Sequence, residues 1–409
     1  MTAATADVVI VGGGLVGASL AIALGGSGLQ VRVVDPVTAT APEQPSYDDR
    51  STALSPTSRR ILEALELWPA INGEAAPIRT IHVSDRGGFG VTRMQAEREG
   101  LDALGHVVPN RVLGRVLRDR LAAQPDAVRS VTARVESAEP GQDAVHLTLD
   151  DGTGLAARVV VAADGTRSAL RACLGIEMRE TDYDQVGVVA NVTPAQPPDG
   201  RAFERFTPEG PLALLPLSGG HCSLVWTVAP ARAEALAALD DAAFLDALQD
   251  AFGHRLGRFL RVGRRAVYPL ALSRSTRRVA DRSVLIGNAA RTLHPVAGQG
   301  FNLALRDVAE LAERLHGAAR RGEDPGAPAL LRGYADARAS DHRRVTAMTD
   351  GLVRLFSNRL PGLRLARNLG LVGMELLPAA RDGLVRQAMG RGSRVPRLAR
   401  GLSLESDHG

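Results

Sequence analysis

Three glycines near the start of the chain have the spacing of a phosphate-binding turn. Gly12, Gly14 and Gly17 follow the apolar run 7–11 and precede a helix-like stretch, so they form GxGxxG between a predicted strand and a predicted helix. The first glycine permits a tight turn, the second lets a pyrophosphate approach the backbone, and the third packs the helix on the strand. The amides at the helix N-terminus would stabilise the phosphate charge. This pattern predicts a bound adenine dinucleotide.

Two acidic residues follow predicted strands at the edge where such a ligand would lie. Asp35 ends the second apolar strand, and a carboxylate there can accept hydrogen bonds from ribose hydroxyls while repelling a 2′-phosphate. Asp164 and Gly165 follow the buried-type run 158–163, again at the carboxyl end of a strand. Open α/β sheets bind their ligands at that edge. The Asp-Gly pair alone is weak evidence, because it is a common turn sequence.

A third segment, residues 287–302, is rich in glycine, proline and asparagine. Pro295, Gly298 and Gly300 would let the main chain come close to a flat ligand, and a helix beginning near Phe301 would direct its amides at it. Reduced flavin carries negative charge around its pyrimidine ring, and a helix N-terminus stabilises such charge. The segment is therefore predicted to face the isoalloxazine of a flavin.

The elements that would hold these segments show two kinds of hydrophobic pattern along the chain. Buried parallel strands and a βαβ unit predict a Rossmann-like α/β domain. Alternating stretches bounded by Gly and Pro predict an inserted antiparallel sheet, and the end of the chain, from about Val345, is predicted to be helical. The predicted ranges are 1–75, 100–180 and 275–345 for the FAD-binding domain, 76–99 and 181–274 for the substrate domain, and 346–409 for a basic helical region.

These motifs together resemble a known family. The trio GxGxxG, DGxxSxxR and G(D/N)AAxxxxPxxGQGxN, in this order, is similar to the class A flavoprotein monooxygenases, which share the para-hydroxybenzoate hydroxylase fold. Within that class, residues 287–303 and 202–216 resemble the ubiquinone-biosynthesis hydroxylases, and most of all the 2-polyprenyl-6-methoxyphenol hydroxylases. The resemblance spans nearly the whole chain.

The resemblance implies a set of contacts to FAD bound without a covalent link. The residues at the matching positions are Gly12, Gly14, Gly17, Asp35, Arg50, Asn110, Asp164, Gly165, Asn288, Pro295, Gly298, Gln299, Gly300 and Asn302. Asn288 departs from the aspartate of the wider class, but its amide oxygen can still accept a hydrogen bond. Arg291 stands where the family often has histidine, so no role is assigned to it. His294 is a candidate for deprotonating or orienting a phenol, although a lone histidine is more often structural.

The implied reaction is hydroxylation of the aromatic ring of a polyprenylated methoxyphenol in ubiquinone biosynthesis. NAD(P)H would reduce the flavin, O2 would add at C4a, and the hydroperoxide would attack the ring. Apolar residues of the inserted sheet are expected to line a cavity over the flavin, and Arg205 is a candidate clamp for a smaller acidic substrate. The apolar set is Leu212, Leu214, Cys222, Leu224 and Trp226.

Several other functions share the cofactor motifs. They are hydroxylation of another phenol, flavin-dependent reduction or desaturation of an isoprenoid, and a non-catalytic FAD-bearing scaffold in a biosynthetic complex. A halogenase would need paired tryptophans, yet Trp68 and Trp226 are far apart. A dithiol reductase would need paired cysteines, whereas Cys173 and Cys222 are distant in sequence. That distance also argues against a metal site.

Charge and composition bear on partners and location. The chain has no lysine, its 49 basic residues are all arginine, and its formal net charge is +4. No targeting or membrane-spanning segment is recognisable and nothing indicates nucleic-acid binding, so we expect a cytoplasmic protein. Between Arg354 and Arg400 ten arginines stand against Glu375 and Asp382. Such a tail suits a helical lid with a solvated arginine face. It equally suits a peripheral contact for anionic lipid at the inner face of the cytoplasmic membrane, or for other ubiquinone-biosynthesis proteins, and we expect it to do some of both.

Overall fold

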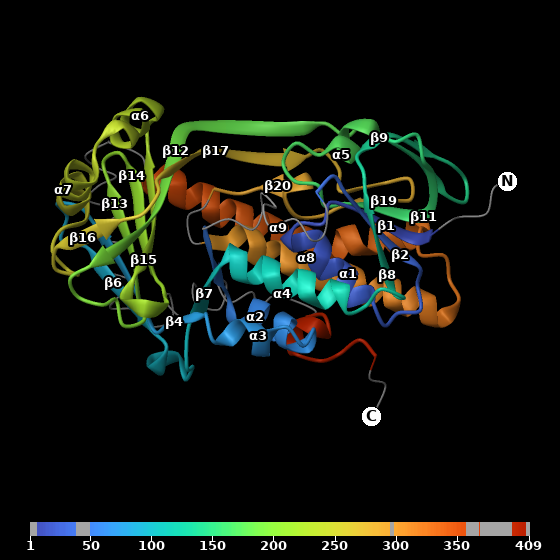
Figure 1. Ribbon diagram of the computed structural model, residues 1–409, viewed down its shortest axis with the longest axis horizontal. Helices are drawn as coiled ribbons and strands as arrows, with labels where there is room; N and C mark the ends of the chain where they lie inside the picture. The colour runs from blue at the N-terminus through green and yellow to red at the C-terminus, as the bar shows by residue number, and fades with distance from the viewer. Residues whose placement is uncertain (1–5, 38–49, 295–297, 357–367, 369–394, 406–409) are drawn as a thin grey trace.

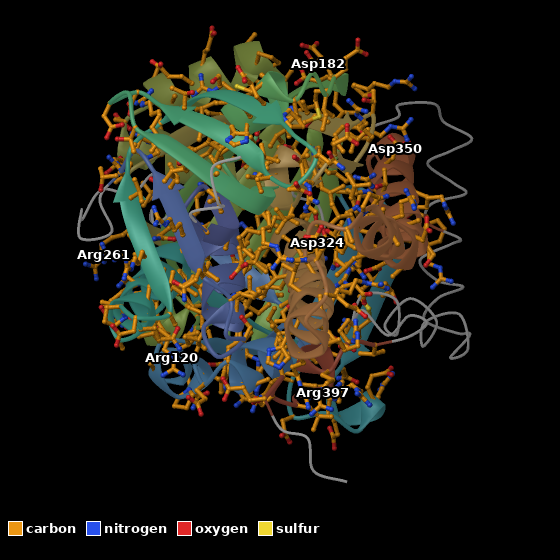
Figure 2. All side chains as sticks on the ribbon, turned by 90° about the vertical axis from the view of Figure 1, so that its right-hand side faces the viewer. Arg120, Asp182, Arg261, Asp324, Asp350 and Arg397 are labelled. Atoms are coloured by element: carbon orange, nitrogen blue, oxygen red, sulfur yellow. The ribbon has the colours of Figure 1, made fainter. Side chains whose placement is uncertain are left out.

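The computed structural model describes residues 6–37, 50–294, 298–356, 368 and 395–405. Figure 1 shows two regions joined by long strands, with a parallel sheet at one end and an antiparallel sheet at the other. Figure 2 shows charged side chains such as Arg120 and Arg261 at the periphery of the molecule. No described helix is long and apolar enough to cross a membrane.

The first region is built on a parallel sheet whose strands are apolar on both faces. Its main strands run in the order β18-β19-β11-β1-β2-β8, and all neighbours except β18 and β19 pair in parallel. The strands are β1 (Ala6–Val11), β2 (Val31–Asp35), β8 (Val128–Thr132), β11 (Gly154–Ala162), β18 (Val279–Ala280) and β19 (Ser283–Leu285). Continuous burial suits strands covered on both sides.

Helices cover one face of this sheet and an antiparallel hairpin covers the other. Val8, Ile10 and Val161 pack on the helical side, while Val9 and Val160 pack toward the hairpin. The helices are α1 (Leu15–Leu24), α2 (Pro56–Ala64), α3 (Trp68–Asn72), α4 (Asn110–Ala122) and α8 (Gln299–Arg321). The hairpin strands are β9 (Val135–Pro140) and β10 (Val145–Leu149), and α5 (Ala169–Cys173) packs beside them. The alternation follows from the period of two along a strand.

The second region is a largely antiparallel sheet in the order β20-β17-β12-β15-β14-β13-β5-β6, with β16 beside β12. Its strands are β5 (Thr80–Asp85), β6 (Val91–Gln95), β12 (Met178–Pro194), β13 (Arg201–Thr207), β14 (Gly210–Pro216), β15 (Cys222–Val228), β16 (Phe259–Val262), β17 (Ala266–Ser275) and β20 (Arg291–Thr292). Helices α6 (Pro230–Ala238) and α7 (Asp241–Phe252) cover its outer face, away from the parallel sheet (Figure 1). Strand β20 lies in the range 275–345 predicted for the other domain, and it pairs with β17 here.

A small sheet and a long helix connect the two regions. The small sheet consists of β3 (Ser51–Leu54), β4 (Ala76–Ile78) and β7 (Gly105–Pro109). Helix α9 (Pro328–Phe356) packs on α8, and its end lies near the antiparallel sheet in Figure 1. Short 3-10 turns complete the described chain at η1 (Glu97–Glu99), η2 (Ser218–Gly220), η3 (Gly287–Ala289) and η5 (Leu398–Arg400).

Two predicted element boundaries were wrong. The helix predicted over 231–252 is two helices, because Asp240 caps α7 by accepting a hydrogen bond from Ala243 N at 2.8 Å. The helix expected from about Val345 already begins at Pro328, since proline fits a first helical turn. Most of the predicted basic tail lies outside the described residues, but η5 packs against α2.

Candidate active site

The glycine turn after β1 is closed in a way that excludes side chains. Gly12 has φ +106°, and a Cβ on it would lie 2.5 Å from the carbonyl oxygen of Ala163. A Cβ on Gly17 would collide with the carbonyl of Gly12. Gly14 is the N-cap of α1, which places the first amides of that helix beside the turn. The turn therefore has the tight geometry and the N-terminal amides that a pyrophosphate requires.

Asp35 lies at this turn, as predicted, and already bonds to it. Its Oδ2 accepts from Gly13 N at 2.5 Å and its Oδ1 accepts from Val37 N at 2.8 Å. The carboxylate thus fixes the turn and the chain after β2. Its contact with a ribose stays a prediction.

Asp164 supplies the clearest sign that a ligand belongs here. Its Oδ2 accepts from Leu170 N at 3.2 Å, but its Oδ1 is buried and has no hydrogen-bond partner among the described residues. Its Cα lies 2.7 Å from where a Cβ on Gly12 would be. Gly165, with φ +85°, has no atom within 4 Å of its own ideal Cβ position. A buried carboxylate oxygen without a donor is costly, so a ligand hydroxyl fits this position.

The segment predicted to face the flavin ends in a helix N-terminus. Gly298 takes the left-handed conformation, with φ +57°, and α8 begins at Gln299, two residues before the predicted start. A Cβ on Gly300 would meet nothing within 4 Å, so the first turn of α8 borders open space. Asn288 is exposed in η3. Pro295 lies outside the described residues.

Asn302 is fully engaged within the protein. Its Oδ1 accepts from Ser55 N at 2.8 Å and from Ser58 Oγ at 2.7 Å. Its Nδ2 donates to Ala53 O and Gly298 O, both at 2.8 Å. The side chain therefore ties the flavin-facing segment to β3 and α2, which is a positioning role.

Arg291 holds the same segment from the other side, a role that no sequence signal suggested. Its Nη1 donates to His342 O at 2.9 Å and also to Thr346 Oγ1, both on α9. Burial lowers the pKa of this guanidinium to about 10, so it stays charged at neutral pH. Long side chains of this kind cannot be paired with their targets from sequence, since the targets lie 51 and 55 residues away.

Two further predicted residues lie where the small sheet meets the antiparallel sheet. The guanidinium of Arg50 lies 4.7 Å from the ring centroid of Tyr268 in β17, within cation–π distance. Asn110 begins α4, and its Oδ1 accepts from Thr52 Oγ1 at 2.7 Å. Both residues thus line the junction between the two regions.

His294 is almost completely buried. Its ring stands edge-on to Tyr183 at 5.7 Å, and Tyr183 donates to Asp350 Oδ1 at 2.7 Å. Burial lowers the pKa of His294 to about 4, so the imidazole is neutral at physiological pH. Its catalytic role stays a prediction.

The expected cavity lining in the antiparallel sheet was wrong. The five apolar residues, from Leu212 to Trp226, point to the outer face and pack with Leu236, Phe244 and Leu248 of α6 and α7. Arg205 is on that face too, where its Nε donates to Ala251 O at 3.1 Å. It is not a clamp over the flavin. Alternation along each strand fixes the two faces but not which one meets the neighbouring domain, so the sequence could not decide this.

The inner face of the sheet carries the opposite set of side chains, including one carboxylate that the sequence analysis missed. Ala202 and Leu215 on this face pack with Ala53 and Val107 of the small sheet. The face is therefore turned toward the first region, which holds the parallel sheet and the glycine turn. Glu204 follows Ala202 by two positions in β13, so its side chain is on the same face, and its partner across the strand pair is Ala213. It forms no hydrogen bond or ion pair with any other described residue. Burial raises the pKa of its carboxyl to about 7.

A buried charged cluster fixes α8 against α9 behind the flavin-facing segment. Arg338 Nε lies 2.7 Å from Asp307 Oδ1, and His342 Nε2 lies at the same distance from that oxygen. Arg306 and Arg338 both bond to Asp341, at 2.8 and 2.6 Å. The contacts with His342 and Arg338 hold the pKa of the Asp307 carboxyl below its usual range despite its burial. Within the part of the chain that is described, no group of His, Cys, Asp and Glu side chains could hold a metal ion.

Comparisons with known proteins agree with this geometry. The FAD binding domain family model matches residues 5–349. Ubiquinone hydroxylase UbiL of Rhodospirillum rubrum is 42% identical, and the match covers 98% of this chain and 94% of that protein. The 3-demethoxyubiquinol 3-hydroxylase of Escherichia coli is 33% identical, covering 95% of this chain and 100% of that protein.

A solved structure shows the same fold. The p-nitrophenol 4-monooxygenase PnpA from Pseudomonas putida superimposes with a TM-score of 0.77 at 20% identity, covering 95% of this chain and 99% of the other. The predicted fold class, a Rossmann-like domain with an inserted antiparallel sheet and a C-terminal helical region, is thereby confirmed.

Proposed function

Because the chain belongs to the ubiquinone-biosynthesis hydroxylases, a family of FAD-dependent monooxygenases, we propose that it hydroxylates the ring of a polyprenylated methoxyphenol on the way to ubiquinone. The family, the enzyme class and FAD as cofactor are confirmed predictions. The identity of 42% over nearly the full length of a ubiquinone hydroxylase is the observation that carries the substrate assignment. The electrons come from NAD(P)H and the inserted oxygen from O2.

The residues around the glycine turn fit FAD. Gly12 and Gly17 leave no room for side chains at the turn, and the unpaired oxygen of Asp164 offers an acceptor for a hydroxyl of the cofactor. The α1 N-terminus would hold the pyrophosphate, and the α8 N-terminus at Gln299 and Gly300 would hold the flavin ring. When bound, FAD supplies the activation of O2 that no protein side chain can perform. The chain binds and orients it.

The inner face of the antiparallel sheet orients the phenol. Most of its side chains are apolar, as Ala213, Leu215 and Val225 illustrate, which suits a prenylated ring and keeps water away. Glu204 is the acidic group on this face whose pKa of about 7 matches proton acceptance at neutral pH. We assign to its carboxylate the acceptance of the phenolic proton, since a phenolate directs more electron density into the ring.

A substrate comparison tests this function. Purified FAD-loaded enzyme is incubated aerobically with NAD(P)H and either a prenylated methoxyphenol of varied chain length or para-hydroxybenzoate, and products are read by mass spectrometry. We expect product only from the prenylated series, with affinity rising with chain length because each added unit buries apolar surface. Hydroxylation of the small acid alone would overturn the substrate assignment while leaving the monooxygenase in place.

The substrate's isoprenoid tail implies access from a membrane or from a partner protein. We propose that the basic C-terminal region makes this contact at the inner face of the cytoplasmic membrane, using arginines between Arg354 and Arg400. Flotation with liposomes should then require anionic lipid and decline as salt is raised. Flotation that responds to neither would contradict the lipid contact and leave a partner protein as the alternative.

A further inference from the structure

The long strand β12, which runs with β17 between the two regions (Figure 1), is interrupted by a bulge. Two adjacent residues of β17 pair with Asp182 and Gln185 of β12. Tyr183 and Asp184 are therefore two extra residues that have no partner in the ladder. Bulges occur preferentially beside active sites, where they direct a side chain out of the regular strand.

The two aspartates around Tyr183 build this bulge. Asp184 takes the left-handed conformation, with φ 50°, which Gly, Asn and Asp adopt more readily than other residues. Its backbone N–H donates to Asp182 Oδ1 at 2.9 Å. Both aspartates are exposed, and Figure 2 shows Asp182 at the periphery of the molecule, whereas Tyr183 between them is half-buried. A left-handed residue costs free energy and persists where the surrounding structure holds it.

Tyr183 joins helix α9 to the flavin-facing segment. Its hydroxyl donates to Asp350 Oδ1 on α9 at 2.7 Å, and its ring stands edge-on to the imidazole of His294 with 5.7 Å between the centroids. His294 belongs to the flavin-facing segment and is 1% exposed. Arg291 of the same segment donates to Thr346, one helical turn before Asp350. The same end of α9 therefore holds the segment directly and also through Tyr183.

The pairing of the strands explains why Tyr183 and His294 meet. Strand β17 lies between β20 and β12. It pairs with β20 through Ser273 and Thr292. Two residues earlier in β17, Ala271 pairs with Asp182 at the start of the bulge. Since β17 and β20 are antiparallel, the chain leaves β20 toward His294 at the level of the bulge.

We propose that Tyr183 is a positioning residue of the oxygenation. Through its contacts with His294 and Asp350 it fixes the flavin-facing segment, and with it the N-terminus of α8, relative to FAD. This role rests on the function proposed above for its reaction and on bound FAD alone for its first test. A helix N-terminus stabilises the negative charge of reduced flavin. Loosening the segment should therefore weaken the binding of reduced FAD more than that of oxidised FAD.

The first test needs no aromatic substrate. The midpoint potential of bound FAD is measured in wild type, Tyr183→Phe, Asp350→Ala and the double variant. Each single variant should bind reduced FAD about tenfold more weakly relative to oxidised FAD, as for one lost hydrogen bond, which lowers the midpoint potential by about 30 mV. The double variant should show the same fall, because both substitutions break one bond.

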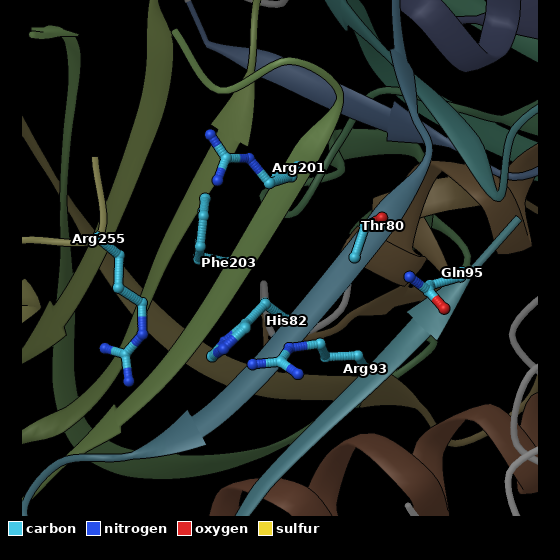
Figure 3. Close-up of a pocket in the computed structure, with 7 residues that line it drawn as sticks. All are labelled: Thr80, His82, Arg93, Gln95, Arg201, Phe203 and Arg255. Carbon is cyan, nitrogen blue, oxygen red and sulfur yellow. The ribbon is translucent and has the colours of Figure 1, made fainter. Parts of the chain in front are cut away.

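Two matched controls lose the same chemical groups elsewhere. Asp336→Ala removes an exposed carboxylate from α9. Thr80→Val removes a hydroxyl from the pocket of about 390 Å³ that opens over β5, β6 and β13 (Figure 3), whose lining contains no residue of β12. Both controls should keep the ratio of the two FAD affinities within about twofold of wild type. Flavin content and melting temperature confirm that each variant is folded.

Two results would overturn the role of Tyr183. The first is a wild-type midpoint potential in both Tyr183→Phe and Asp350→Ala, even with lowered melting temperatures, since Tyr183 would then only stabilise the fold. The second is a double variant whose effect is the product of the two single effects, because the two side chains would then act separately.

Turnover separates this role from the substrate assignment. With a prenylated methoxyphenol, Tyr183→Phe and Asp350→Ala should lower kcat and the product formed per NAD(P)H about tenfold, while KM stays within about threefold. If wild type forms no product from this phenol but the midpoint potentials shift as expected, the substrate assignment fails and Tyr183 keeps its role. If both variants form as much product per NAD(P)H as wild type, Tyr183 does not position the reaction.

Discussion

At the scale of single residues, the carboxyl group of Glu204 has an environment that favours function over stability. Its folded-state pKa of about 7 lies above the ordinary value of 4.5, so the neutral form is favoured in the folded protein. Stability from this group is present below the unfolded pKa and is lost as the pH rises toward the folded pKa. Glu204 therefore destabilises the protein at pH 8 relative to pH 4.

Replacing Glu204 with Gln should separate activity from stability. We expect kcat to fall about a hundredfold, as for a lost general base, and the ionisation near pH 7 to vanish from the pH profile. The melting temperature should rise by about 2–4 °C at pH 8 and change little at pH 4. The exposed Glu234→Gln on α6 is the matched control. An unchanged pH profile in Glu204→Gln would remove the carboxylate from the mechanism.

At the scale of elements, the flavin-facing segment depends on one amide. Asn302 makes four hydrogen bonds that join this segment to β3 and to the start of α2. Asn302→Ala should lower stability by about 3 kcal/mol, because several buried groups lose their partners, and should weaken FAD binding. Flavin fluorescence on dilution gives the dissociation constant. The exposed Asn72→Ala should leave FAD affinity unchanged, and equal affinity in the two variants would contradict the positioning role.

The elements around the cofactor were predictable because their signals are local. A strand, a glycine turn and a helix follow one another within residues 6–24, and each glycine has a steric reason that the structure supports at Gly12 and Gly17. The faces of the antiparallel sheet were not predictable, because both faces carry apolar side chains. The long-range contacts of Asn302 and Arg291 join residues that are 51 to 249 positions apart, and no periodicity in the sequence indicates such contacts.

At the scale of the whole molecule, the buried charges between α8 and α9 couple the flavin-facing helix to the long helix that reaches the antiparallel sheet. Arg338→Met would leave Asp307 charged and without its nearest guanidinium, so we expect a loss of about 3–5 kcal/mol. Arg343→Met, an exposed position on the same helix, is the control. Thermal unfolding, monitored through the release of flavin, gives the melting temperatures of both variants. Similar melting temperatures would show that the cluster contributes little to stability.

The contribution of the same cluster to stability should depend on pH in a defined direction. The pKa of Asp307 is depressed, so its contribution to stability is present above the unfolded pKa of about 3.8 and declines as the pH falls below it. The Arg338→Met variant should consequently lose its difference from wild type in strong acid, which the same unfolding measurement at several pH values would show.

The central claim, that this fold inserts one atom of O2 into a prenylated phenol, is tested most directly by isotope labelling. Enzyme, NAD(P)H and a prenylated methoxyphenol are incubated under 18O2, and the mass of the product is measured by mass spectrometry. The account predicts a product with one 18O atom that forms only with reductant and with bound FAD. A product whose added oxygen comes from water, or complete consumption of reductant without any oxygenated product, would contradict it.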